Sequence, residues 1–230
     1  MWNRQQVKEQ AKQIMKRNYW KMFVVTLLAG TLSGEKTTII EKVQDFASNN
    51  LSYDAQPIFY SSNFQYIFYS FISVASILGI LYTIFIGNVI VVGKNGYFIK
   101  NHDKNSELSE IFSGFKGNYL NVVKIMFLMD LKTLLWLFLF IVPGVVKAYE
   151  YSMIPYLLAE NPNLSASQAF SLSKQMTTGQ KMDLFVLDLS FLGWIILGLI
   201  CCGIGILFVL PYPEATKAEV YLNLKESVKI

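Results

Sequence analysis

Residues 66–92 read YIFYSFISVASILGILYTIFIGNVIVV, a long apolar run without a charged side chain. A helix that crosses the hydrocarbon core of a bilayer needs about 20 consecutive apolar residues, so this run predicts a transmembrane helix. The composition agrees, because 53% of the chain is hydrophobic and only 16% is charged, whereas soluble domains carry about 25% charged residues. The sequence therefore predicts an all-α protein whose helices form a polytopic bundle in a membrane.

Further apolar runs predict about six transmembrane helices, arranged as three hairpins in a single membrane domain over residues 1–230. Because glycine and proline interrupt helices, turns are expected at Pro143 and Gly144 in the middle hairpin, and also at Gly179, Gly203 and Gly205. A further break is expected near Pro211. The expected spans cover approximately residues 20–33, 66–92, 119–141, 145–159, 182–199 and 204–222.

Each hairpin is preceded by a polar segment with apolar residues at helical spacing. Such a pattern is typical of an amphipathic helix that lies on a membrane surface. The three helices are expected at residues 1–18, at about 106–116 and at about 165–178, where Ser165 and Gln168 have the spacing of a capping box. The order of amphipathic helix, short polar break and span recurs three times, which indicates a weak internal repeat.

Lysine and arginine are concentrated in the segments that hold these amphipathic helices, while acids outnumber bases in residues 34–65. Since basic residues mark the cytoplasmic side, we expect both termini to be cytoplasmic. The first helix is expected to bind anionic lipids, each well-placed basic residue contributing about 1 kcal/mol. Its attachment to a span favours lipid over nucleic acid as its partner. The basic residues of this lipid-binding surface are Arg4, Lys8, Lys12, Lys16 and Arg17.

Three charged residues lie deep within the expected spans: Asp130, Lys132 and Asp188. A charge inside the bilayer is costly and is a functional hypothesis by default. One interpretation is that Lys132 pairs with Asp188 and holds two helices together; another is that Asp130 and Asp188 form a proton or ion relay. A third is that the spans are shifted and these residues lie at the water interface.

The sequence contains no pattern typical of an enzyme. Its one histidine, His102, and its two adjacent cysteines, Cys201 and Cys202, do not supply a metal site or a Ser/His/Asp triad. Nor is there a glycine-rich phosphate loop. We therefore expect no catalytic residues, no bound metal and no cofactor.

Several stretches in combination resemble a known family of bacterial integral membrane proteins, the domain of unknown function family 975. They are AKQIMKRNYWKMFVVTLL (11–28), IFSGFKGNY (111–119), the region from IVPGVVKAYEY to LSFLGW (141–194) and GIGILFVLPYPEATKAEVY (203–221). The most specific elements are S-x-x-M-x-x-G-x-K, LSFLGW and PY-x-x-x-T-x-A. The resemblance implies a plasma-membrane protein of Gram-positive bacteria with no established activity.

Two classes of function remain. The first is a non-enzymatic membrane protein that acts as an accessory, scaffold or protective (immunity-like) factor for a protein partner that the sequence does not identify. The second is a small solute or ion transporter or channel that uses Asp130, Lys132 and Asp188 in a hydrated path.

Overall fold

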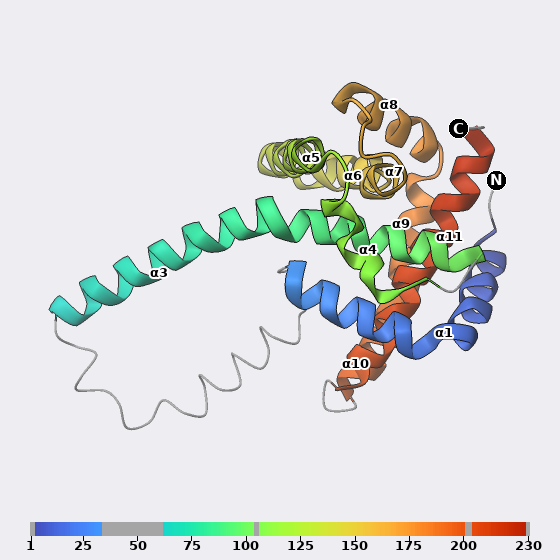
Figure 1. The fold of residues 1–230 in the computed structure, drawn as a ribbon, viewed down its shortest axis with the longest axis horizontal. Coiled ribbons are helices and arrows are strands. Elements are labelled where there is room, and N and C mark those ends of the chain that lie inside the picture. Colours follow the sequence, from blue (N-terminus) through green and yellow to red (C-terminus); the bar gives the residue numbers. More distant parts are fainter. Residues whose placement is uncertain (1–2, 34–61, 104–105, 201–203, 229–230) are drawn as a thin grey trace.

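The computed structural model describes residues 3–33, 62–103, 106–200 and 204–228, and all regular secondary structure in these ranges is helical (Figure 1). The predicted all-α class is confirmed for this part of the chain. The elements are α1 (Arg4–Ser33), α3 (Ser62–Tyr82), the π-helical turn η1 (Thr83–Gly87), α4 (Asn88–Asp103), the 3-10 helix η2 (Leu108–Phe115), α5 (Tyr119–Leu139), α6 (Ile141–Tyr151), α7 (Ile154–Glu160), α8 (Ala166–Thr177), α9 (Lys181–Ile200), α10 (Ile204–Val209) and α11 (Pro211–Val228).

The apolar run at residues 66–92 lies in one continuous helical rod. The rod consists of α3, η1 and α4, and its α3 end extends away from the other helices (Figure 1). Within the described residues, Ser73–Asp103 is the one helix that is long and apolar enough to cross a membrane. The sequence predicted a span over residues 66–92, and its predicted end near Val92 is wrong because α4 continues to Asp103.

The other expected spans are helical, and several are interrupted. Residues 145–159 are divided between α6 and α7, and residues 204–222 between α10 and α11. The second break follows Val209, and Pro211 begins α11, where the sequence predicted a kink. A bundle of six spans therefore stays a prediction.

Helix α1 bends at Asn18, whose φ of −137° and ψ of 27° are not helical. The bend is fixed by contacts with the end of α4: the Asn18 side-chain amide donates to Asn101 Oδ1 at 3.1 Å. Arg17 donates to the Asn101 carbonyl oxygen at 2.8 Å. The expected boundary between a helix at 1–18 and a span at 20–33 thus coincides with a real bend.

The predicted turn at Pro143 and Gly144 is wrong. The chain turns at Phe140, whose backbone is extended (φ −155°, ψ 136°), and both predicted residues lie in the first turn of α6. Proline is tolerated there because the first backbone N–H groups of a helix have no partner within it. A Cβ on Gly144 would lie 2.6 Å from Leu137 Cα, so this glycine allows α5 and α6 to approach closely.

The remaining predicted turns have different outcomes. Gly179 has a φ of 76° and makes the turn between α8 and α9. Gly205 lies within α10, so the turn predicted there is wrong, whereas Gly203 lies outside the described residues. The predicted capping box of Ser165 and Gln168 is present at the start of α8.

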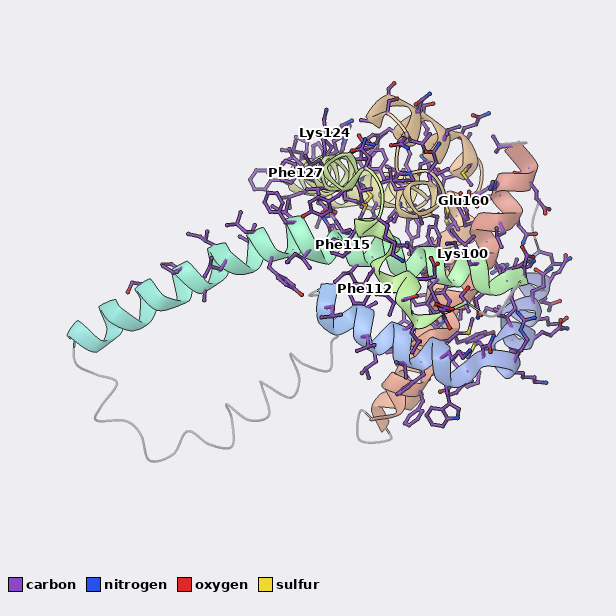
Figure 2. All side chains as sticks on the ribbon, in the orientation of Figure 1. Lys100, Phe112, Phe115, Lys124, Phe127 and Glu160 are labelled. Atoms are coloured by element: carbon purple, nitrogen blue, oxygen red, sulfur yellow. The ribbon has the colours of Figure 1, made fainter. Side chains whose placement is uncertain are left out.

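Helix α4 occupies the centre of the molecule and packs against α1, η2, α5, α7 and α11. Even its polar residues Lys94, Asn95 and Asn101 are buried. The predicted amphipathic helix at 106–116 is present as η2, which buries Ile111 against this core and leaves Phe112 and Phe115 exposed. Phe112, Phe115 and Phe127 lie toward the side from which α3 extends, and Lys100 and Glu160 lie nearer α11 (Figure 2).

Candidate functional site: a charged cavity between α4, α9 and α11

A cavity of about 190 Å³ lies between α4, α6, α7, α9 and α11, and four charged side chains line it. Lys94 Nζ on α4 is 3.1 Å from Glu214 Oε1 on α11. Lys217 Nζ on α11 is 3.1 Å from Asp188 Oδ1 on α9. The Tyr149 hydroxyl donates to the other Asp188 oxygen at 3.0 Å. Two cations and two anions therefore share one cavity.

The local sequence explains how these groups meet. Glu214 and Lys217 are three residues apart on α11, so they lie on the same side of that helix. The side chain of Lys94 is only 5% exposed, and a buried charge is tolerated only where an opposite charge or hydrogen bonds compensate it. Glu214 provides that compensation. The paired charges leave a small polar space that could hold water or a small polar solute.

Of the three deep charges predicted from the sequence, only Asp188 lines this cavity. Lys132 Nζ lies 3.9 Å from the centre of the Phe170 ring, and Asp188 pairs with Lys217, so the structure does not bring together the two side chains that one interpretation paired. Asp130 accepts a hydrogen bond from the Asn88 side chain at 2.6 Å. It borders a separate, mostly apolar cavity of about 540 Å³ next to α3, α5 and α6, so Asp130 and Asp188 do not share a cavity.

Sequence reasoning missed Lys94, Glu214 and Lys217. Lys94 lies just beyond the expected span 66–92, so it was not counted among the deep charges. Glu214 and Lys217 lie inside the expected span 204–222. Charged residues inside a span are a functional hypothesis by default, so their position was the signal that could have identified them.

A second charged cluster surrounds Glu150, whose side chain is only 6% exposed. Its carboxylate pairs with Lys147 at 2.8 Å on the same helix and with Lys181 at the start of α9. Its backbone carbonyl accepts a hydrogen bond from the Ser173 hydroxyl on α8 at 2.7 Å. Glu150 therefore connects α6, α8 and α9.

These contacts give a physical role to each residue of the S-x-x-M-x-x-G-x-K element. Ser173 binds the Glu150 carbonyl, and Met176 is buried in the core. Gly179 adopts the positive φ of the turn, a conformation that costs other L-residues about 1–2 kcal/mol. Lys181 then reaches the Glu150 carboxylate. The element closes the turn between α8 and α9 onto α6.

The LSFLGW and PY elements also meet in space. The Phe191 ring packs edge to face on Tyr212, with ring centres 5.2 Å apart. On α11, the Thr216 hydroxyl donates to the Tyr212 carbonyl oxygen at 2.8 Å. Lys8 joins the same cluster from α1, with Nζ 4.8 Å from the centre of the Phe191 ring.

The basic residues of the first helix do not form one uniform lipid-facing surface. Lys8 donates to the Ser190 hydroxyl at 2.6 Å, and Arg17 binds carbonyl oxygens at the end of α4. Burial, and then the positive charges of Arg4 and Lys12, lower the pKa of the Lys8 ammonium group. Lys12 and Lys16 instead border an apolar groove. In the described part of the chain, no three His, Cys, Asp or Glu residues are grouped so that they could hold a metal ion.

Comparisons with known proteins identify one family. Residues 141–228 match the family model described as "Protein of unknown function (DUF975)". The S-x-x-M-x-x-G-x-K, LSFLGW and PY elements all lie inside the matched segment. No curated protein and no solved structure matches the chain. Over residues 141–228, the chain is therefore similar to the DUF975 family of proteins of unknown function.

Proposed function

We propose that this chain is a multi-pass integral protein of the bacterial plasma membrane that catalyses no reaction and serves as an accessory, scaffold or protective factor for a protein partner. The observation that carries the proposal is an extended exposed apolar surface on α3, α5, the start of α6 and α9. Phe138 is 92% exposed, and its neighbours Phe140, Ile141 and Val142 are also exposed. Exposed apolar patches of this kind mark membrane or protein interaction sites.

In this proposal the rod formed by α3, η1 and α4 crosses the bilayer together with α5, α9 and the apolar parts of α1, α6–α7 and α10–α11, giving about six spans. Both termini are cytoplasmic. Two observations support this orientation: the beginning of α1 and the end of α11 lie on the same side of the molecule (Figure 1), and α1 carries a row of basic residues.

Fractionation of native membranes tests the proposal. We expect the chain to stay in the membrane pellet after alkaline extraction and to be released only by detergent. Mild detergent purification should then recover the same partner protein in repeated preparations. Release by alkali contradicts membrane insertion, and repeated recovery of the chain with lipid alone contradicts a role that depends on a protein partner.

A second candidate function is passage of a small polar solute or ion through the charged cavity, and the shared lining by Lys94, Asp188, Glu214 and Lys217 favours it. Here Asp188→Asn is expected to abolish most flux, because Lys217 loses its anionic partner and the charge balance of the cavity changes. The measurement is flux of protons, sodium and potassium into liposomes that contain the purified protein.

The matched control for this flux measurement is Asp183→Asn. Asp183 lies in the first turn of the same helix, does not line the cavity, and undergoes the same change of charge. Equal flux through the wild type and both variants would exclude a role for the cavity. Liposomes with the wild type that are no more permeable than empty ones would remove the second candidate altogether.

A further inference from the structure

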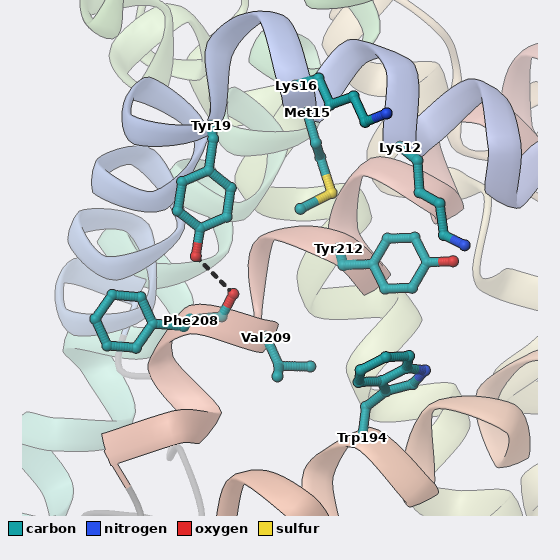
Figure 3. A pocket seen from close by; sticks show the side chains of 8 residues that line it. All are labelled: Lys12, Met15, Lys16, Tyr19, Trp194, Phe208, Val209 and Tyr212. Atoms are coloured by element: carbon teal, nitrogen blue, oxygen red, sulfur yellow. Dashed lines mark hydrogen bonds between the residues drawn. The ribbon is translucent and has the colours of Figure 1, made fainter.

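A third cavity, an apolar groove of about 490 Å³, lies between α1 and the segment formed by α9, α10 and α11 (Figure 3). Aromatic side chains from four different helices form much of its wall. Trp194 belongs to α9, Phe208 to α10 and Tyr212 to α11, while Tyr19 comes from α1. The groove volume lies in the range of about 300–1,000 Å³ that is typical of sites for small ligands.

The interior of the groove is mostly apolar, because the Tyr19 hydroxyl in its wall is bound within the protein. The Tyr19 hydroxyl donates to the Phe208 carbonyl oxygen at 2.9 Å, so both groups are satisfied within the protein. The rings of Trp194 and Phe208 remain about half exposed. An exposed groove with this lining suits an alkyl chain better than a polar solute.

Two lysines supply positive charge at one edge of the groove. Lys12 and Lys16 are four residues apart on α1, and their side chains lie on the side of the groove opposite Trp194 (Figure 3). Among the described residues, neither ammonium group forms an ion pair with a carboxylate. The neighbouring Lys8 and Arg17 differ, because both make hydrogen bonds within the protein.

We infer that this groove binds one anionic phospholipid, with its phosphate between Lys12 and Lys16 and an acyl chain along Phe208 and Trp194. Two cations next to an apolar groove favour a lipid of net negative charge over phosphatidylcholine, whose choline cation already compensates its phosphate. The groove also lies at the bend of α1 at Asn18, with Lys16 before the bend and Tyr19 directly after it, where the proposed surface helix ends and the proposed span begins. The inference rests on the proposed membrane location of the chain.

The test uses the full chain in nanodiscs, with Trp194 as its sole tryptophan after Trp2, Trp20 and Trp136 are replaced with phenylalanine. Brominated acyl chains quench tryptophan fluorescence on contact. We expect brominated phosphatidylglycerol, added at a low fraction to phosphatidylcholine discs, to quench Trp194 far more than brominated phosphatidylcholine does. The double variant Lys12→Gln/Lys16→Gln should lower this preference by about tenfold, a reduction within the range expected for two basic residues.

The matched control is Lys124→Gln/Lys174→Gln, which removes the same charge from exposed positions on α5 and α8 outside the groove. It should keep the preference for the anionic lipid. The inference is overturned if both brominated lipids quench Trp194 of the wild type equally. It is also overturned if the control variant loses as much of the preference for phosphatidylglycerol as the Lys12→Gln/Lys16→Gln variant does. Either result leaves the proposed function intact. A chain that does not enter the nanodisc contradicts the proposed function itself.

Discussion

Gly93→Ala is expected to cause a large loss of thermal stability, because α4 and η2 touch at this residue without room for a side chain. A Cβ at position 93 would lie 1.9 Å from the Ile111 carbonyl oxygen and 2.6 Å from its carbonyl carbon. Both are backbone atoms, so a rotamer change cannot relieve the clash. On η2, a Cβ at Gly114 would similarly lie 2.5 Å from the Val89 carbonyl oxygen. Overpacking typically costs about 1–3 kcal/mol, and a backbone clash places Gly93→Ala at the upper end.

Gly79→Ala on α3 is the matched control for this prediction. No atom lies within 4 Å of a Cβ built there, and alanine is favoured over glycine in a helix by about 1 kcal/mol. The two substitutions should therefore shift the thermal midpoint of the detergent-solubilised protein in opposite directions, as followed by size-exclusion chromatography after heating. Similar midpoints for both variants would mean that α4 and η2 are not in this close contact.

Glu150→Ala is expected to produce the second large effect. The carboxylate is nearly buried and compensates the charges of Lys147 and Lys181. Removing one partner of a fully buried pair costs about 3–5 kcal/mol. Here the two lysines are 26% and 29% exposed, so water can solvate them in part. A loss of about 2 kcal/mol is therefore expected, close to the value of a hydrogen bond to a charged group.

The matched control is Glu110→Ala, which breaks the pair between Glu110 and Lys100. That pair has an N–O distance of 2.7 Å, but the lysine is 57% exposed, so its loss should be barely measurable. The measurement is the thermal midpoint of both variants. It is also taken for Lys181→Ala and for the double variant Glu150→Ala/Lys181→Ala, which shows whether the two residues act together. Additive effects of Glu150→Ala and Lys181→Ala would contradict direct coupling between α6 and α9.

The features that sequence analysis predicted well depend on neighbouring residues in the chain. The apolar run at 66–92 does form a helix, Ser165 and Gln168 form their capping box, and Gly179 adopts the positive φ of a turn. The capping box and the glycine turn are each determined within one or two helical turns. The bend at Asn18 was also anticipated, since the residue separates the basic helix from the apolar run.

The features that sequence analysis missed depend on which helices meet. Asp188 pairs with Lys217 because side chains of α9 and α11 meet across the charged cavity, and the apolar pattern of either helix does not encode that arrangement. Lys94 was missed because the span was predicted to end at Val92, where polar residues begin. In the structure, α4 is surrounded by other helices, and Glu214 satisfies its lysine. The turn at Phe140 was missed because any residue type can adopt an extended backbone, so the sequence does not mark it. Pro143 and Gly144 are residue types that usually indicate a turn, but here they lie in α6.

We expect the exposed apolar surface of α3, α5, α6 and α9 to face lipid. The test uses spin labels in reconstituted vesicles. Each label is attached to a single cysteine at Leu134 or Phe138, in a chain whose Cys201 and Cys202 are replaced by serine. Both positions are exposed and apolar, whereas Lys174 on α8 is an exposed polar reference. We expect labels at 134 and 138 to be more accessible to oxygen, which partitions into lipid, and the label at 174 to be more accessible to a water-soluble nickel chelate. Greater accessibility of positions 134 and 138 to the nickel chelate would contradict a membrane-embedded surface.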